Sequence, residues 1–164
     1  MASARASKGK AGTSEDDERL ELARFLPYQL SVVAENVSRV FARRYAQTFG
    51  LTVPEWRVMA VLAEMGDIAT QDIIERTQMD PVRVSRAAIR LTDKGFVARR
   101  VHPEDQRAYV MRLSPKGVEV YRQIVPLARA LEAELTESLT PVERQRLEEI
   151  LAKIHAHARV LNED

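Results

Sequence analysis

The stretch Asp80–Gly117 reads DPVRVSRAAIRLTDKGFVARRVHPEDQRAYVMRLSPKG, and it is the part of the chain from which the fold is inferred. Its first half predicts a helix, because an aspartate followed by a proline is a typical helix start and Gly95 is a typical stop. Val84, Ala88 and Leu91 share one face of that helix. The remaining faces are rich in arginine, so one side of the helix should be buried and the other should be basic.

The second half of the stretch predicts a β-hairpin, and the residues upstream predict two further helices. Alternating apolar residues indicate strands over about Phe96–Val101 and Tyr109–Leu113, with the polar loop His102–Ala108 between them. Upstream, Thr52–Glu55 is a capping box that starts one helix, and Thr70 is expected to cap the next. The order of helix, turn, basic helix and hairpin is that of a winged helix-turn-helix lobe.

Long apolar rows flank this lobe and predict helices that pack against a partner. Before the lobe, apolar residues recur at alternating spacings of four and three: Leu26, Leu30, Val33, Val37 and Val40. After the lobe, a second row has a spacing of four: Leu127, Leu131 and Leu135. A single lobe offers these rows no obvious partner, and their burial at ~25 cal/mol per Å² favours association. The sequence therefore predicts a homodimer.

These elements divide the chain into three parts. Residues 1–17 are rich in small and polar residues, have almost no large apolar side chains and are expected to be disordered. Residues 51–113 are expected to form the winged lobe, and residues 18–50 and 114–164 the helical dimerisation region. The expected fold class is mainly α with a small β-hairpin wing, which is formally α+β.

Composition argues against several classes of protein. The 164 residues include no cysteine, which removes disulfides and thiol-based sensing. His155 and His157 are two residues apart and point to different sides of a helix, so neither a metal site nor a cofactor is expected. No nucleophile with a base and no phosphate-binding loop can be assembled, so an enzyme is not expected. The absence of a long apolar run and of a secretory signal favours a cytoplasmic protein without membrane contact.

Positive charge is concentrated in the middle of the chain. The net charge is only +1, but residues 76–112 carry nine basic and four acidic residues. From residue 113 to the end, seven basic residues face nine acidic ones. Segregation of this kind is typical of a surface that binds phosphate, whereas an ordinary solvated surface would mix the signs.

The basic helix carries the candidate DNA-binding residues. On its exposed arc, arginine can contact guanine in a major groove and serine can contact a base or a phosphate: Arg83, Ser85, Arg86 and Arg90. Further contacts to double-stranded DNA are expected from Thr70 and Gln71 at the start of the preceding helix, where N–H groups can meet a phosphate, and from Pro81 at the start of the basic helix. At the hairpin tip, Arg107 is placed to enter a minor groove, and Asp105 to hold its orientation. Each of these residues alone could be an ordinary solvated side chain, and the combination favours DNA.

The same residues resemble a known family. Asp105-Gln-Arg107 followed by Val110–Gly117 is similar to the wing signature of the MarR (multiple antibiotic resistance regulator) family, and Val84–Val97 resembles its recognition helix. Leu139–Ile154 is similar to its closing helix, so the resemblance spans about residues 25–154. It implies a homodimer with intertwined terminal helices and two winged lobes on successive major grooves of a pseudo-palindromic operator. In that arrangement Arg107 would be the minor-groove arginine.

The resemblance also implies a small effector. Family members are often repressors released by an aromatic or other anionic ligand, such as an aromatic acid or its CoA thioester, bound between the dimer helices and the lobe. In this chain an aromatic wall and cations are candidates for that junction: Tyr28, Arg39, Arg43, Tyr45 and Trp56. Plain core and surface roles for these residues stay open, as do a constitutive DNA binder and a structural helical dimer without a ligand.

Overall fold

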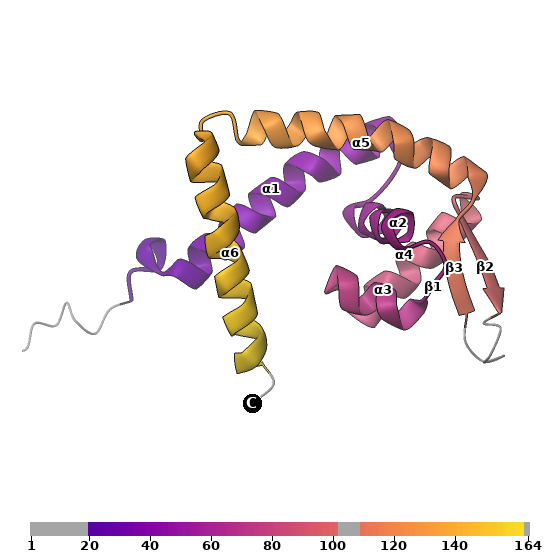
Figure 1. Cartoon of the computed structure of the whole chain (residues 1–164), viewed down its shortest axis with the longest axis horizontal. Helices are drawn as coiled ribbons and strands as arrows, with labels where there is room; N and C mark the ends of the chain where they lie inside the picture. The colour runs from indigo at the N-terminus through magenta and orange to yellow at the C-terminus, as the bar shows by residue number, and fades with distance from the viewer. Residues whose placement is uncertain (1–19, 102–108, 163–164) are drawn as a thin grey trace, which may run out of the picture. The chain divides into compact units, whose positions relative to one another are not determined.

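The structure, a computed structural model, describes residues 20–101 and 109–162 (Figure 1). A short 3-10 helix, η2 (Leu22–Arg24), is followed in order by α1 (Leu26–Phe49), α2 (Val53–Met65), β1 (Ile68–Ala69), α3 (Thr70–Thr77), α4 (Pro81–Asp93), β2 (Val97–Val101), β3 (Tyr109–Leu113), α5 (Pro115–Leu135) and α6 (Pro141–Leu161). The chain divides inside α1 into two compact units, Met1–Arg39 and Val40–Asp164. The prediction of a mainly helical fold with a small hairpin is confirmed.

Most helix starts follow the capping rules that the sequence suggests. A hydroxyl or carboxylate of the N-cap residue accepts a backbone N–H at each of four starts: Thr52, Asp80, Ser114 and Thr140. The prediction that Thr70 is an N-cap is wrong. Thr70 is the first residue of α3, the N-cap is Ala69, and no side chain bonds this cap. The reason is that Ile68 and Ala69 form strand β1, whose extended backbone leads directly into the helix.

The sheet is antiparallel, with the strand order β1–β3–β2. In the hairpin, Val97 lies opposite Leu113 and Val101 opposite Tyr109. On the other side of β3, Ile68 of β1 lies opposite Met111. Strand β1 could not be expected from the sequence, because two residues show no alternation and their pairing depends on a distant strand. The pairing attaches the start of α3 to the base of the hairpin.

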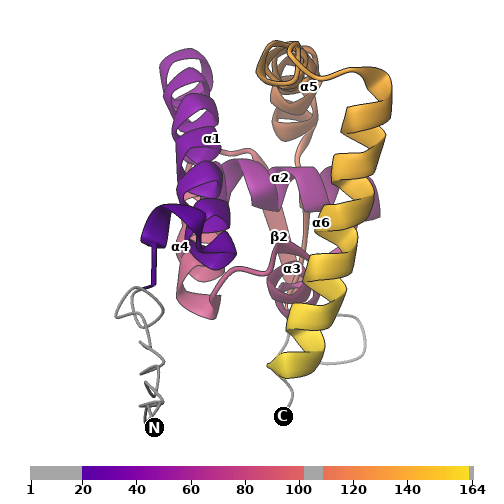
Figure 2. The same ribbon diagram turned by 90° about the vertical axis from the view of Figure 1, so that its left-hand side faces the viewer.

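One core holds the lobe together. Helices α3 and α4 pack against α2 and against each other (Figures 1 and 2). The largest fully buried apolar side chains come from these helices, the sheet, the last turns of α1, the loop after α1 and the middle of α5: Tyr45, Leu51, Met59, Leu62, Ile73, Leu91, Met111 and Ile124. The predicted apolar face of α4 is confirmed, because Val84, Ala88 and Leu91 are all buried. Each fully buried side chain of this size stabilises the lobe by roughly 1.5–3 kcal/mol.

The flanking helices keep apolar residues exposed. In the first unit, Leu26 is 52% exposed and Val33 is 59% exposed. In the second unit, α6 exposes Val142, Leu147, Ile150, Leu151, Val160 and Leu161. Among the described residues, no helix is both long and apolar enough to cross a bilayer.

The apolar row of α5 differs from its prediction. Leu135 is exposed as expected, but Leu131 is buried and Leu127 packs against the lobe core. The expectation that this row lacks a partner is therefore wrong for two of its three residues. The physical reason is that α5 starts on the lobe, where Ile124 is part of the core, so this helix already uses one face within the chain.

Candidate nucleic-acid interface

Helix α4 buries one face and presents the other to solvent. Asp80 starts the helix by accepting the backbone N–H of Arg83 at 2.9 Å. The buried face consists of Val84, Ala87, Ala88 and Leu91, none more than 3% exposed. Anchoring by these four residues leaves a continuous exposed face. The arginines and the serine predicted to contact DNA from this helix lie on it: Arg83, Ser85, Arg86 and Arg90. The structure therefore brings them together on one rigid element.

The arginines on this face differ in how they are held. Arg83 pairs with Asp80 at 3.2 Å, with exposed side-chain fractions of 72% and 51%, and an ion pair this exposed contributes only about 0–1 kcal/mol. Within residues 20–101 and 109–162, no acidic side chain pairs with Arg86 or Arg90. Their guanidinium groups are available to an external anion.

A hollow of about 290 Å³ lies between the arginine face and the start of α2. Its lining is half arginine: Thr52, Pro54, Arg83, Arg86, Ala87 and Arg90. The Glu55 carboxylate already accepts the Thr52 backbone N–H at 2.6 Å, so the start of α2 is capped by its own side chain. The attraction for an anion here comes from the arginines rather than from the helix end.

The other predicted helix-start contacts are on the surface or close to it. Thr70 is half-buried, while Gln71 and Pro81 are exposed. The Gln71 side-chain amide donates to Glu75 at 3.2 Å, a contact that DNA would have to compete with. Asp72 in the first turn of α3 adds a negative charge beside any phosphate bound there.

The hairpin tip is outside the described residues, and with it Asp105 and Arg107. At the base of the hairpin, the Arg99 guanidinium lies 4.5 Å from the centroid of the Tyr109 ring. Arg100 pairs with Asp67 at 2.5 Å. The first contact spans β2 and β3, and the second joins β2 to the residue before β1. Both stiffen the base from which the tip extends.

Two apolar residues on α4 were not expected in the interface. Val82 is 56% exposed and Ile89 is 49% exposed, on the same helix as the arginines. Apolar side chains at a DNA-binding surface can contact the methyl group of thymine. The signal was present in the sequence, because both residues lie outside the buried row of Val84, Ala88 and Leu91.

Two of the predicted effector residues lie against a cavity. Tyr45 and Trp56 help to line a cavity of about 340 Å³, together with Phe41, Tyr121, Val125, Ala128, Arg129 and Glu132. The Trp56 ring stacks on Tyr121 with centroids 6.0 Å apart, and Tyr45 contacts Trp56 at 5.3 Å. The Tyr45 hydroxyl is buried without a hydrogen-bond partner among the described residues. Burial raises the pKa of Tyr45 to about 12.

The cations of this cavity are not the predicted ones. Tyr28 and Arg39 belong to the first unit, where Tyr28 is exposed and Arg39 pairs with Glu35 at 3.6 Å. Arg43 is exposed and is not part of the lining. The lining includes Arg129 instead. Nothing local in the sequence singles out Arg129, because the cavity is formed jointly by residues of α1, α2 and α5.

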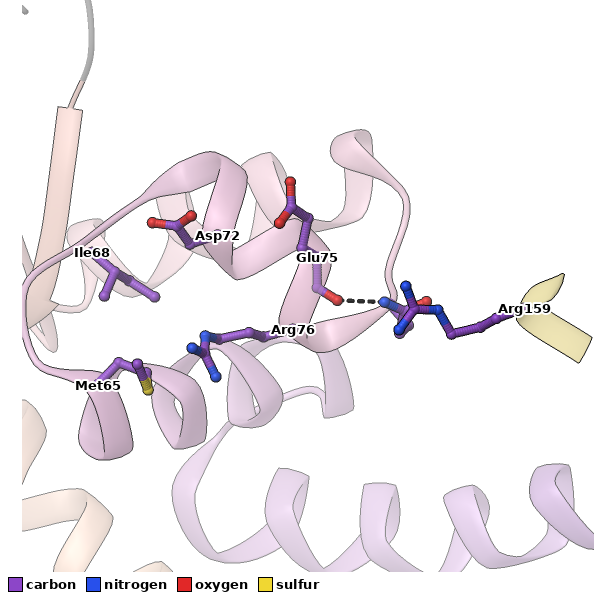
Figure 3. Close-up of a pocket in the computed structure, with 7 residues that line it drawn as sticks. Met65, Ile68, Asp72, Glu75, Arg76 and Arg159 are labelled. Atoms are coloured by element: carbon purple, nitrogen blue, oxygen red, sulfur yellow. Dashed lines mark hydrogen bonds between the residues drawn. The ribbon is translucent and has the colours of Figure 1, made fainter. Parts of the chain in front are cut away.

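Another hollow in the second unit has a mixed lining (Figure 3). It measures about 520 Å³ and is lined by Met65, Ile68, Asp72, Glu75, Arg76, Gln78 and Arg159. The Gln78 amide donates to the Glu75 carbonyl oxygen, as Figure 3 shows. In the part of the chain that is described, no group of three histidine, cysteine or acidic residues could hold a metal ion. With acidic and basic groups interleaved, this hollow presents no concentrated charge comparable to the arginine face.

Comparison with known proteins gives a consistent result. A family model described as "MarR family" matches residues 49–108. The transcriptional repressor IacR of Pseudomonas putida is 25% identical over 72% of this chain and 71% of its own length. A mutant MarR of Escherichia coli, solved in complex with operator DNA, has a TM-score of 0.73 and 25% identity, covering 79% of this chain and 92% of that one. BpsR of Bordetella bronchiseptica, described as regulated in DNA binding by 6-hydroxynicotinic acid, has a TM-score of 0.78 and 21% identity, covering 84% and 97%.

Proposed function

The chain is a MarR-family winged-helix transcriptional regulator, and from this premise we propose that it acts as a homodimeric repressor of genes next to a pseudo-palindromic operator. Members of this family are transcriptional regulators and not enzymes. In the proposal, residues 51–113 form the DNA-binding lobe and residues 18–50 and 114–164 the dimerisation region. Its main support is the exposed arginine face of α4 on a fully buried apolar row.

In the proposed complex, α4 enters the major groove. Arg86 and Arg90 approach base edges or phosphates, because neither is engaged by an acidic side chain within residues 20–101 and 109–162. Arg83 and Ser85 flank them on the same exposed face. Thr70, Gln71 and Pro81 contact the DNA backbone, which sets the orientation of the lobe.

The hairpin supplies a second contact. We assign Arg107 to an adjacent minor groove and Asp105 to the orientation of its guanidinium. The paired base of the hairpin, with Val110 and Met111 buried, gives this tip a fixed attachment. A minor-groove arginine on a stable base adds affinity where the groove is narrow.

Dimerisation is supported by exposed apolar residues on the flanking helices. Leu26 and Val33 in the first unit, and Leu147, Ile150 and Leu151 on α6, are each at least 43% exposed. Each of these helices exposes several large apolar side chains, and an isologous dimer covers such side chains with a second copy.

The proposed effector is a small aromatic acid, free or as a thioester. The support is the aromatic cavity lined by Tyr45, Trp56 and Tyr121, with the cation Arg129 in the same lining. The Bordetella protein that shares the fold is regulated by an aromatic acid, 6-hydroxynicotinic acid. An occupant bound against α2 and α5 could alter how the lobe is held and release the operator.

A selection experiment tests the proposal. The full chain is used to select duplexes from a random pool, and affinity for the tightest duplex is measured at several salt concentrations. A homodimer that reads DNA should select a pseudo-palindromic duplex. Its affinity for that duplex should fall steeply with salt, because protein groups that bind phosphates release counterions. Failure to enrich any duplex would leave the structural helical dimer as the better interpretation. Enrichment without release by any aromatic acid would leave a constitutive DNA binder.

A further inference from the structure

One lysine ties the end of α4 to two other helices. The Lys94 ammonium donates to the Glu55 carboxylate at 2.9 Å and to the Gly50 carbonyl oxygen at 2.8 Å. Gly50 directly follows α1, and Glu55 lies in the first turn of α2. These partners are 44 and 39 residues away in sequence, so a single side chain joins the C-terminal end of α4 to the corner between α1 and α2.

The Glu55 carboxylate in this contact is buried, and both of its oxygens accept hydrogen bonds. Glu55 is 1% exposed, and its second oxygen accepts the backbone N–H and the hydroxyl of Thr52 at 2.6 and 3.0 Å. Burial by itself raises the pKa of Glu55, but the hydrogen bonds from Thr52 and the Lys94 ammonium hold it below its ordinary value. A buried carboxylate without a positively charged partner is strongly destabilising, so the Glu55 carboxylate holds the Lys94 ammonium in position.

The same end of α4 is also attached to the start of α5. Lys116 donates to the Lys94 carbonyl oxygen at 3.0 Å, and the Ser114 hydroxyl donates to the Gly95 carbonyl oxygen at 2.6 Å. At Gly117 a Cβ atom would collide with the carbonyl oxygen of Phe96, so the two backbones are in close contact there. We call this set of contacts around Lys94, with Gly50, Glu55, Ser114 and Lys116, the Lys94 clasp.

We propose that Lys94 is a positioning residue for DNA recognition, whose side chain sets the placement of the α4 arginines relative to the corner between α1 and α2. Arg90 is one helical turn before Lys94, so a shift of the clasp moves this guanidinium directly. Directional hydrogen bonds to base edges weaken with small displacements, whereas attraction to phosphate depends much less on geometry. The clasp therefore acts on specificity more than on overall affinity. This inference rests on the proposed function.

The test uses four variants of the full chain. Lys94→Met removes the ammonium and keeps an apolar stem. Glu55→Gln removes the buried charge, and glutamine at this position still completes a capping box. The double variant Glu55→Gln/Lys94→Met removes both charges, so no unpaired buried carboxylate remains. Lys153→Met on α6, an exposed lysine outside the clasp, is the control for loss of one positive charge.

The measurements are affinity for the tightest duplex selected by the wild-type protein, affinity for poly(dI-dC), the salt dependence of both, and the melting temperature. Lys94→Met and the double variant should bind the selected duplex about tenfold more weakly, the loss expected for one impaired base contact. Their affinity for poly(dI-dC) and their salt slopes should stay unchanged. The double variant should melt at a higher temperature than Lys94→Met, and Lys153→Met should match wild type throughout.

Several outcomes would overturn the inference. A salt slope lowered by about one in Lys94→Met would show that this lysine contacts a phosphate itself. A specific-to-nonspecific ratio that recovers in the double variant together with the melting temperature would show a purely structural role. An unchanged specific-to-nonspecific affinity ratio in both Lys94→Met and the double variant would also contradict the positioning role of Lys94. If wild type selects no duplex at all, the proposed function fails first and the inference fails with it.

Discussion

The winged lobe and the flanking helices use their apolar residues in opposite ways. Inside the lobe, Leu91 and Ile73 have no exposed surface, and residues from the helices and the sheet close around them. On the flanking helices, Leu26, Val33 and Leu151 keep about half of their surface exposed. The lobe thus closes its own core, whereas the flanks leave large apolar side chains exposed to solvent.

This difference separates two kinds of stability. Substitutions in the lobe core should change the free energy of unfolding whatever the protein concentration. Substitutions on the flanks should act through association, and their effects should depend on concentration. The proposed dimer and the proposed operator contact can therefore be tested separately. For each substitution, the unfolding free energy, the dimer dissociation constant and the operator affinity show which interaction it affects.

Leu91→Ala should have the largest effect. The side chain is fully buried between α4 and the rest of the core, and such a truncation costs about 2–5 kcal/mol through lost burial and the cavity left behind. Urea denaturation at two protein concentrations measures it. Ile89→Ala, close to it in sequence but 49% exposed, is the matched control and should cost far less. Equal losses in the two variants would show that the assigned buried face of α4 is wrong.

The lobe was largely predictable from sequence because its signals are local. A capping box at Thr52, the aspartate–proline start at Asp80 and the apolar row from Val84 to Leu91 each lie within one or two helical turns. Strand β1 was not predictable, because two residues carry no periodicity and depend on pairing with Met111. The Lys94–Glu55 contact could not be predicted either, since nothing local links two residues 39 apart.

The candidate site was predictable to a similar extent. The exposed arginines of α4 follow from the same periodicity that defines its buried face. The effector cations do not, because a row of charged residues along a helix says nothing about which one faces a cavity formed by another helix. Arg129 lines the aromatic cavity, and Arg43 does not.

Leu151→Ala should weaken the flanks without weakening the lobe. Because Leu151 is 45% exposed, a dimer that buries it gains less than half of a full leucine burial, and truncation removes about 1 kcal/mol of association free energy per copy. Sedimentation equilibrium measures the dissociation constant, and urea denaturation of the dilute protein should show little change. Lys153→Met, on the same helix, is the control. A monomeric wild-type protein at micromolar concentration would contradict the dimer, and an unchanged dissociation constant would place Leu151 outside its interface.

Arg86→Ala should separate binding from folding within α4 itself. One lost contact to a base or phosphate is expected to reduce operator affinity by about 1–3 kcal/mol, or roughly 5- to 150-fold. The melting temperature should stay close to wild type, since the side chain is exposed and unpaired within the described residues. Arg122→Ala, an exposed arginine on α5, is the charge-matched control. Equal affinity losses in the two variants would indicate general electrostatic attraction rather than a contact made by α4.

Tyr45→Phe should give the smallest effect, and it tests a buried polar atom that the lobe core leaves unpaired among the described residues. An unsatisfied buried hydroxyl costs about 1–3 kcal/mol, so its removal should stabilise the protein by about 1 kcal/mol or less after loss of packing is counted. Because the folded-state pKa of Tyr45 is about 12 against an ordinary 10.0, the stability linked to its protonated form is complete below pH 10 and is lost as pH rises through 12. The wild-type unfolding free energy should therefore fall more steeply than that of Tyr45→Phe over this range. If the variant is instead less stable at pH 7, the hydroxyl has a partner, and the aromatic cavity that it lines is where that partner should be sought.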